Sequence, residues 1–208
     1  MEPHPVIITS LNGARDMLTS DKAQEFQAVI SIGHQVAGNE AEGEEYPLGY
    51  KNFGADGRQV KHRMNIGDIR FLDPNWEDWF PHRATPRPKD TEDLIAFFPK
   101  IEGPVLVHCF AGMSRSPAAA LTYLAWALGP GNEAEIIARL FEIKPRTTPN
   151  HLMVAYADIL LGHGRALYDA MLIARGSHIY PELQIIYKQA KALIRGGDIP
   201  YFEPGDRS

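Results

Sequence analysis

The stretch VLVHCFAGMSRSPAAA, residues Val105 to Ala120, determines how the rest of the chain is interpreted. A run of mainly apolar residues predicts a strand that leads directly into Cys109, the only cysteine among the 208 residues. A short loop of small and polar residues follows, and then an alanine-rich segment typical of a helix. In parallel α/β sheets, ligands bind beyond the carboxyl ends of strands, where loops lead into helices. The sequence therefore predicts a ligand site around Cys109.

The loop after Cys109 contains the residue types that an oxyanion site needs. A helix beginning near Arg115 points its unpaired amides and partial positive charge back at the loop, which favours bound anions and a thiolate. Ala111, Gly112 and Ser114 are small, so that successive backbone amides can curve around a tetrahedral oxyanion. Arg115 adds a planar guanidinium that can bind two phosphate oxygens at once. The pattern predicts a phosphate-binding loop with a nucleophile at its base.

The same residues match a known signature. HCFAGMSRS, His108 to Ser116, resembles the signature loop of the protein tyrosine phosphatase superfamily: histidine, cysteine, five residues, arginine, and serine or threonine. The form AGMSRS is similar to the compact dual-specificity branch. Downstream, KPRTTPNHLMVAYADILLG (Lys144 to Gly162) is similar to the helical segment after this loop in that branch and in small bacterial relatives. Together with VISIG, which matches the usual second strand, the resemblance covers residues Val6 to Ala174.

The resemblance implies a role for each residue of the loop. Cys109 would attack phosphorus in line to give a phosphocysteine, and Arg115 and the loop amides would hold the equatorial oxygens. Ser116 would hydrogen-bond the thiolate and help it to leave in the second step. His108 would orient the loop and affect the acidity of the thiol, and Asn150 is structural in the family. The phosphate-binding amides would be those of Phe110, Ala111, Gly112, Met113, Ser114 and Arg115.

The leaving oxygen needs a proton, which the family takes from an aspartate on a separate loop that afterwards activates water. Three aspartates precede Cys109 in the expected region, namely Asp68, Asp73 and Asp78. We select Asp68 because it follows the alternating segment VKHRMNI (Val60 to Ile66) and would lie at the same edge of the sheet as Cys109. The gap from Asp68 to Cys109 is longer than compact relatives usually show, so Asp73 and Asp78 stay open as alternatives.

The rest of the chain predicts an α/β fold. Helical segments separate four predicted strands. The strands are the β-branched runs Val6 to Leu11 and Ala28 to Gly33, the segment VKHRMNI, and the strand before Cys109. This order favours a phosphatase-like, mainly parallel central sheet flanked by helices, and an all-helical C-terminal half. Helices are expected from Asp90 or Thr91, from Asn132 with a capping-box pattern to Glu135, from about Pro149, from about Arg165, and from Pro181 to Arg195.

Length and hydrophobic content fit one globule. We expect residues 1–175 to form the cysteine phosphatase catalytic domain, with the C-terminal helix and tail of residues 176–208 as part of the same globule. Two irregular segments, Gly38 to Gly57 and Asp68 to Asp90, are rich in glycine or proline and in charge, and are expected to be long loops.

Composition argues against several other classes of protein. A single cysteine forms no intramolecular disulfide, and no secretory signal pattern opens the chain, which favours a cytoplasmic compartment. No apolar run approaches the roughly 20 residues of a membrane span. The net charge is −5 and the basic residues are scattered, so we expect no nucleic-acid partner. The histidines lack metal-ligand spacing, and we expect no metal and no cofactor.

The sequence thus predicts a phosphomonoester hydrolase, a protein tyrosine or dual-specificity phosphatase whose partner is a phosphorylated protein or peptide. A shallow pocket would admit phosphoserine and phosphothreonine as well as phosphotyrosine. Phosphoinositides and an RNA 5′ phosphate are alternative substrates, although the loop lacks the extra lysines that such ligands favour. A further alternative is a module that binds a phosphorylated partner without turnover, which would follow if no acid is correctly placed.

Overall fold

The computed structural model describes residues 1–33, 59–68, 85–177 and 180–200. In this part of the chain, four strands form one sheet in the order β1-β4-β2-β3, and every neighbouring pair is parallel. The strands are β1 (Val6–Ser10), β2 (Ala28–Gly33), β3 (Val60–Asn65) and β4 (Val105–Cys109). The predicted α/β fold with a parallel sheet is confirmed.

The position of each strand in the sheet explains its residue pattern. The central strands β2 and β4 are buried along their whole length, as expected for a parallel sheet that is covered on both faces. The edge strand β3 alternates as predicted, with Met64 and the following Ile66 buried and Lys61 and Asn65 exposed. Cys109, the last residue of β4, is in register with Ser10 of β1, so both lie at the carboxyl edge of the sheet.

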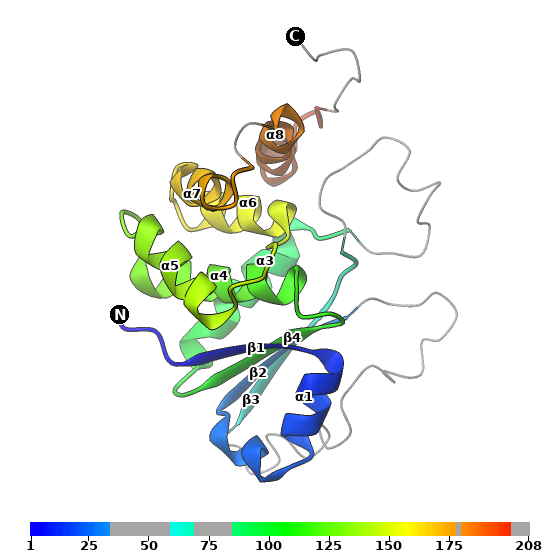
Figure 1. The fold of residues 1–208 in the computed structure, drawn as a ribbon. Coiled ribbons are helices and arrows are strands. Elements are labelled where there is room, and N and C mark those ends of the chain that lie inside the picture. Colours follow the sequence, from blue (N-terminus) through cyan, green and yellow to red (C-terminus); the bar gives the residue numbers. More distant parts are fainter. Residues whose placement is uncertain (34–58, 69–84, 178–179, 201–208) are drawn as a thin grey trace, which may run out of the picture.

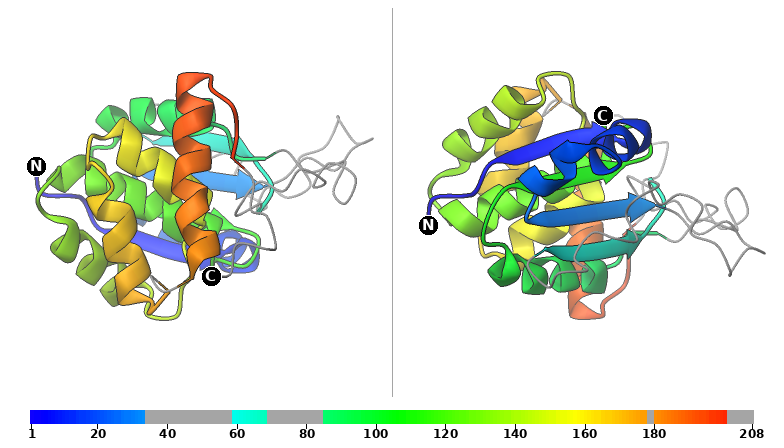
Figure 2. Two further views of the ribbon diagram at one scale, coloured as in Figure 1. Left: turned by 90° about the horizontal axis from the view of Figure 1, so that it is seen from above. Right: turned by 90° about the horizontal axis from the view of Figure 1, so that it is seen from below.

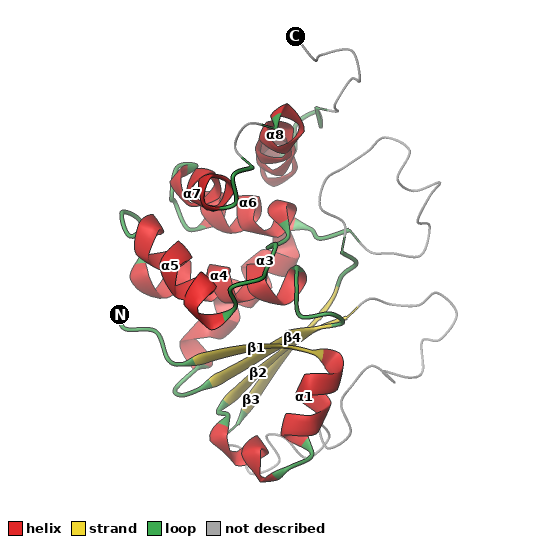
Figure 3. Cartoon of the chain, in the orientation of Figure 1, coloured by secondary structure: helices red, strands yellow, loops and turns green. Residues whose placement is uncertain are grey.

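Helices cover the two faces of the sheet unequally (Figures 1 and 3). On one face lies α1 (Leu11–Leu18), followed by the 3₁₀ turn η1 (Asp21–Glu25). The remaining described helices stack on the other face, with α8 outermost and crossing the others when seen from above (Figure 2). They are α3 (Pro88–Phe97) with the 3₁₀ turn η3 (Phe98–Lys100), α4 (Arg115–Leu128), α5 (Glu133–Ile143), α6 (His151–Leu160), α7 (Ala166–Ala174) and α8 (Pro181–Arg195).

Helix α4 is the centre of the larger core. Twelve of its fourteen residues are buried, because it is enclosed by the sheet on one side and by α5 and α6 on the other. Its small side chains, Ala118, Ala119 and Ala120, are fully buried and allow a close approach to the neighbouring elements. This packing fixes the N-terminus of α4 at the carboxyl end of β4.

One predicted helix start is wrong in detail, and another is right in position but lacks the expected capping bond. Arg87, not Asp90 or Thr91, is the N-cap of α3, because Pro88 occupies the first helical position. The Asp90 carboxylate instead accepts a hydrogen bond from the Arg87 amide at 2.8 Å. Asn132 does precede α5, but its side chain makes no capping bond to the helix. Its amide group turns back and donates to the Leu128 carbonyl at 2.8 Å.

Some sequence predictions fall outside the described residues. They are the loop Gly38 to Gly57 and, within the loop Asp68 to Asp90, residues 69–84, which include Asp73 and Asp78. Within the ranges that the structure does describe, no helix is both long and apolar enough to cross a membrane.

Candidate active site

The loop after β4 is held against the end of β1. Gly112 has a φ of 72°, a left-handed conformation that favours glycine, and a Cβ at this position would lie 2.7 Å from backbone atoms of Thr9. The Leu11 amide donates to the Phe110 carbonyl at 3.1 Å. The curvature of the loop therefore depends on a glycine at this position and on close contact with β1.

A second segment supports the loop from the other side. The Met113 carbonyl accepts hydrogen bonds from the Thr148 amide at 2.9 Å and from the Thr147 hydroxyl at 3.1 Å. The Ser114 carbonyl accepts one from the Asn150 amide at 3.1 Å. Groups outside the loop thus hold the two carbonyl oxygens. In backbone nests, the amides of such a loop face a bound anion.

Cys109 lies in an environment that stabilises a thiolate. Its side chain is only 2% exposed, and Sγ accepts hydrogen bonds from the Ser116 hydroxyl at 3.2 Å and from the Gly112 amide at 3.3 Å. Burial taken alone raises the pKa of the Cys109 thiol. The hydrogen bonds from Ser116, the charge of Arg115 and the Gly112 amide together lower this pKa by more, so that it lies below its ordinary value.

Arg115 is buried with part of its guanidinium group unpaired. The residue is 6% exposed, and its Nη1 donates to the Ile66 carbonyl at 2.9 Å. Its Nε is buried and has no hydrogen-bond partner among the described residues. Buried N–H groups are nearly always paired, so this one indicates a missing acceptor. A phosphate bound in the loop would supply such an acceptor.

Asp68 lies beside the loop, as its position just after the alternating strand predicts. Its Oδ1 accepts hydrogen bonds from the Ser114 hydroxyl at 2.6 Å and from the Asn150 side-chain amide at 3.0 Å. The contact with Asn150 is missing from the sequence analysis. The motif Pro149-Asn150 indicates a helix start, but nothing in it points to an aspartate 82 positions earlier.

His108 is buried beside the site and carries no charge. Neither of its ring nitrogens has a hydrogen-bond partner among the residues described. Burial, and then the nearby charge of Arg63, lower the pKa of His108 to about 4. A neutral, buried imidazole of this kind suits the loop-orienting role expected of His108 better than that of a base.

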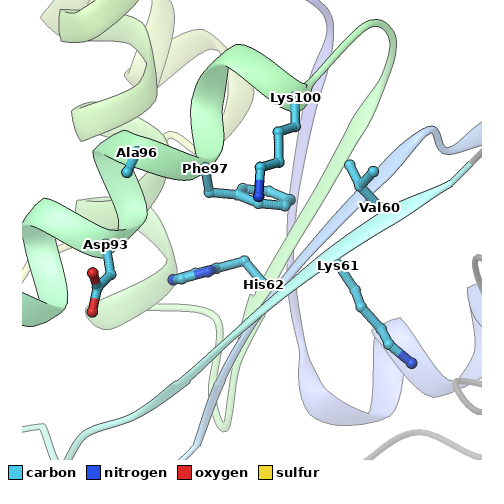
Figure 4. Close-up of a pocket in the computed structure, with 7 residues that line it drawn as sticks. All are labelled: Val60, Lys61, His62, Asp93, Ala96, Phe97 and Lys100. Atoms are coloured by element: carbon cyan, nitrogen blue, oxygen red, sulfur yellow. The ribbon is translucent and has the colours of Figure 1, made fainter.

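A surface hollow of about 450 Å³ lies elsewhere, between β3 and α3 (Figure 4). His62 stacks on Phe97 there, with their ring centroids 5.2 Å apart. Asp93 and Lys100 line the hollow from the helix side and the turn that follows it. It contains no residue of the loop after Cys109.

The fold and the site together define a class: α/β proteins in which a buried cysteine with a lowered pKa ends a parallel strand and is followed by a tight loop and an arginine. No protein-family model and no curated protein matches the sequence. The chain is similar to solved structures of PTPMT1 in complex with PI(5)P, of a human tyrosine phosphatase-like serine/threonine/tyrosine-interacting protein, and of human DUSP28.

The three matches are alike in extent. The identities are 17%, 18% and 16%, and the TM-scores are 0.49, 0.48 and 0.46, respectively. The matches cover 83%, 77% and 82% of this chain and 95%, 93% and 94% of the other chains. At such identities the likeness concerns the fold and gives no information on substrate.

Proposed function

We propose that this protein hydrolyses phosphate monoesters through a covalent phosphocysteine on Cys109. The observation that carries the proposal is the buried Arg115 guanidinium, whose Nε lacks a partner among the described residues and whose charge helps to lower the pKa of the Cys109 thiol. A cationic donor and a thiolate that share a buried loop suit a ligand that is both an anion and an electrophile. A phosphate ester has both properties.

In the first step, the Cys109 thiolate attacks phosphorus, and the bond between phosphorus and the ester oxygen breaks. The loop amides and Arg115 hold the equatorial oxygens while their charge is redistributed. The leaving oxygen takes a proton from the Asp68 carboxyl, so that an alcohol or phenol departs. The support for Asp68 in this role is its place at the carboxyl edge, hydrogen-bonded to Ser114 of the loop.

In the second step, water attacks the phosphocysteine and gives up a proton to the Asp68 carboxylate. The bond between sulfur and phosphorus breaks, inorganic phosphate is released and the thiolate of Cys109 is restored. The Ser116 hydroxyl, 3.2 Å from Sγ, stabilises the departing thiolate by donating a hydrogen bond. Cys109 and Asp68 thus serve in both steps.

The substrate in this proposal is a phosphorylated protein or peptide. Two apolar side chains of the loop are exposed, Phe110 at 64% and Met113 at 39%. Exposed apolar groups beside an anion site provide contact area for the ring of phosphotyrosine or for peptide side chains. This favours a peptide substrate over a purely polar phosphorylated ligand.

The proposal is tested by hydrolysis of p-nitrophenyl phosphate and of phosphopeptides, comparing the wild type with Cys109→Ser. We expect the variant to be inactive, to retain binding of inorganic phosphate, and to lack the phosphorylated enzyme that mass spectrometry detects after acid quenching of the wild type. A wild type that binds phosphopeptides without hydrolysing them would instead be a binding module. A fully active Cys109→Ser variant would also refute the proposal.

A further inference from the structure

We propose that Asn150 is a positioning residue that, together with Ser114, fixes the orientation of the Asp68 carboxyl for proton transfer. This inference rests on the proposed function. It goes beyond the family resemblance, in which Asn150 is structural.

The two donors bind the same oxygen of Asp68. The Ser114 hydroxyl is 2.6 Å and the Asn150 Nδ2 is 3.0 Å from Oδ1. Two donors from different segments on one oxygen restrict the rotation of the carboxyl group. The contacts therefore set how the Asp68 carboxyl is oriented.

The start of helix α6 sets which end of the Asn150 amide faces Asp68. The Asn150 Oδ1 accepts a hydrogen bond from the Met153 amide at 3.1 Å, the usual capping contact of a helix start. Because Oδ1 is turned to the helix, Nδ2 is turned to Asp68. The Asn150 side chain, which is fully buried, thus accepts a hydrogen bond from the helix through Oδ1 and donates one to the Asp68 carboxyl through Nδ2. Serine or aspartate at this position could cap the helix but would not place an amide donor on Asp68.

The same contacts join the acid to the phosphate-binding loop. The Asn150 backbone amide donates to the Ser114 carbonyl at 3.1 Å, so Asn150 contacts the loop and Asp68 at once. Two residues before Asp68, the Ile66 carbonyl accepts the 2.9 Å hydrogen bond from Arg115. The segment from Ile66 to Asp68 is therefore held by the residue that would bind phosphate and by the residue that caps α6. Proton transfer is sensitive to misplacement by about 1 Å, which such a network prevents.

The experiment uses Asn150→Ser and the isosteric Asn150→Asp, both of which keep a capping acceptor. Steady-state kinetics are measured with phenyl phosphate, whose leaving group needs a proton, and with 2,4-dinitrophenyl phosphate, whose leaving group does not. We expect kcat to fall by about 10- to 100-fold on phenyl phosphate and to change by less than about threefold on the dinitrophenyl ester. Inhibition by inorganic phosphate stays unchanged. Asn132→Ser, at the start of α5, is the matched control and has no effect on either substrate.

A double-variant cycle separates positioning from a general structural role. In an Asp68→Asn background, Asn150→Ser should cause no further loss on phenyl phosphate, because its effect passes through Asp68. Three outcomes would overturn the inference and leave the proposed function intact. The Asn150 variants could lose equal activity on both substrates, or the loss of kcat in Asn150→Ser could multiply with that in Asp68→Asn. Both Asn150 variants could also behave like the wild type. If the wild type hydrolyses neither ester, the proposed function fails and the inference fails with it.

Discussion

At the scale of single residues, a few hydrogen bonds and one charge around the Cys109 sulfur lower the pKa of the thiol. Cys109 is as buried as a core residue, and burial opposes its ionisation. Donors from Ser116 and Gly112, with the charge of Arg115, reverse that effect. The sequence analysis predicted these residues because they lie within eight consecutive positions, where backbone geometry alone brings them together. The same reasoning leaves out Asn150, whose contact with Asp68 depends on the whole fold.

Replacing Ser116 by alanine should raise the pH at which the Cys109 thiol ionises. The Ser116 hydroxyl lowers the pKa of Cys109, so its loss raises that pKa, and a smaller fraction of thiolate is present at acidic pH. The rate of alkylation by iodoacetamide and the acidic limb of kcat/KM should both move to higher pH. The remote Ser177→Ala variant is the control. Superimposable profiles for wild type and Ser116→Ala would show that the hydroxyl does not act on the thiol.

Replacing Arg115 by lysine should weaken both phosphate binding and turnover although the charge is kept. A lysine cannot hold the Ile66 carbonyl and two phosphate oxygens in one planar arrangement. We expect kcat to fall by about 10²- to 10³-fold, as for the loss of one oriented donor to a transition state. Isothermal titration with inorganic phosphate and kinetics on p-nitrophenyl phosphate measure the two effects. Wild-type kinetics in Arg115→Lys would mean that charge alone suffices.

At the scale of elements, the strand, loop and helix around Cys109 are predictable from sequence because their signals are local. Alternation predicts β3, and the small residues after Cys109 predict a curved loop. The errors arise where a side chain has a choice of partner. Asn132 has the right type and position to cap α5, yet it bonds to the Leu128 carbonyl of the preceding helix. Capping patterns describe one helix, whereas this contact depends on how two helices meet.

Gly112→Ala tests how strictly the loop depends on its backbone. The new Cβ would lie 2.7 Å from Thr9 backbone atoms in addition to the strain of a φ of 72°, so the loop must move. We expect activity to fall at least about 100-fold, the size of effect that a displacement of about 1 Å produces. Gly129→Ala is a matched control, because its φ is 75° but no atom lies within 4 Å of the added carbon. It should lose some stability and keep its activity. Equal activity of both variants would refute this account.

At the scale of the whole molecule, α6, α7 and α8 are joined by one buried carboxylate, that of Asp158. Its two oxygens accept hydrogen bonds from the Arg165 amide at 2.7 Å, the Tyr168 amide at 3.0 Å and the Tyr187 hydroxyl at 2.7 Å. The last contact helps to pack α8 onto the preceding helices. None of these donors is a residue of the candidate site, so we assign the contacts of Asp158 to stability and not to chemistry.

Asp158→Ala should therefore destabilise the protein without changing the chemistry of the folded fraction. Three donors would lose their acceptor in a buried place, which costs about 3 kcal/mol or more in the free energy of unfolding. Urea denaturation measures this loss, and kcat per active site, counted by stoichiometric alkylation of Cys109, should stay unchanged. Asp169→Ala, which removes an exposed ion pair with Arg165, is the control and should change the unfolding midpoint little. A fall of kcat per active site would connect the contacts of Asp158 to the active site.

The order of the strands also has a consequence for the newly made chain. β1 has no sheet partner among the described residues other than β4, whose residues come about a hundred positions later in the sequence. A growing polypeptide cannot complete the sheet until the segment ending in Cys109 has been synthesised, and the residues that lower the pKa of this thiol follow later still. During synthesis, Cys109 is therefore an ordinary cysteine. The contacts that lower its pKa form only when the strand, the loop and the start of α4 have come together in the folded core.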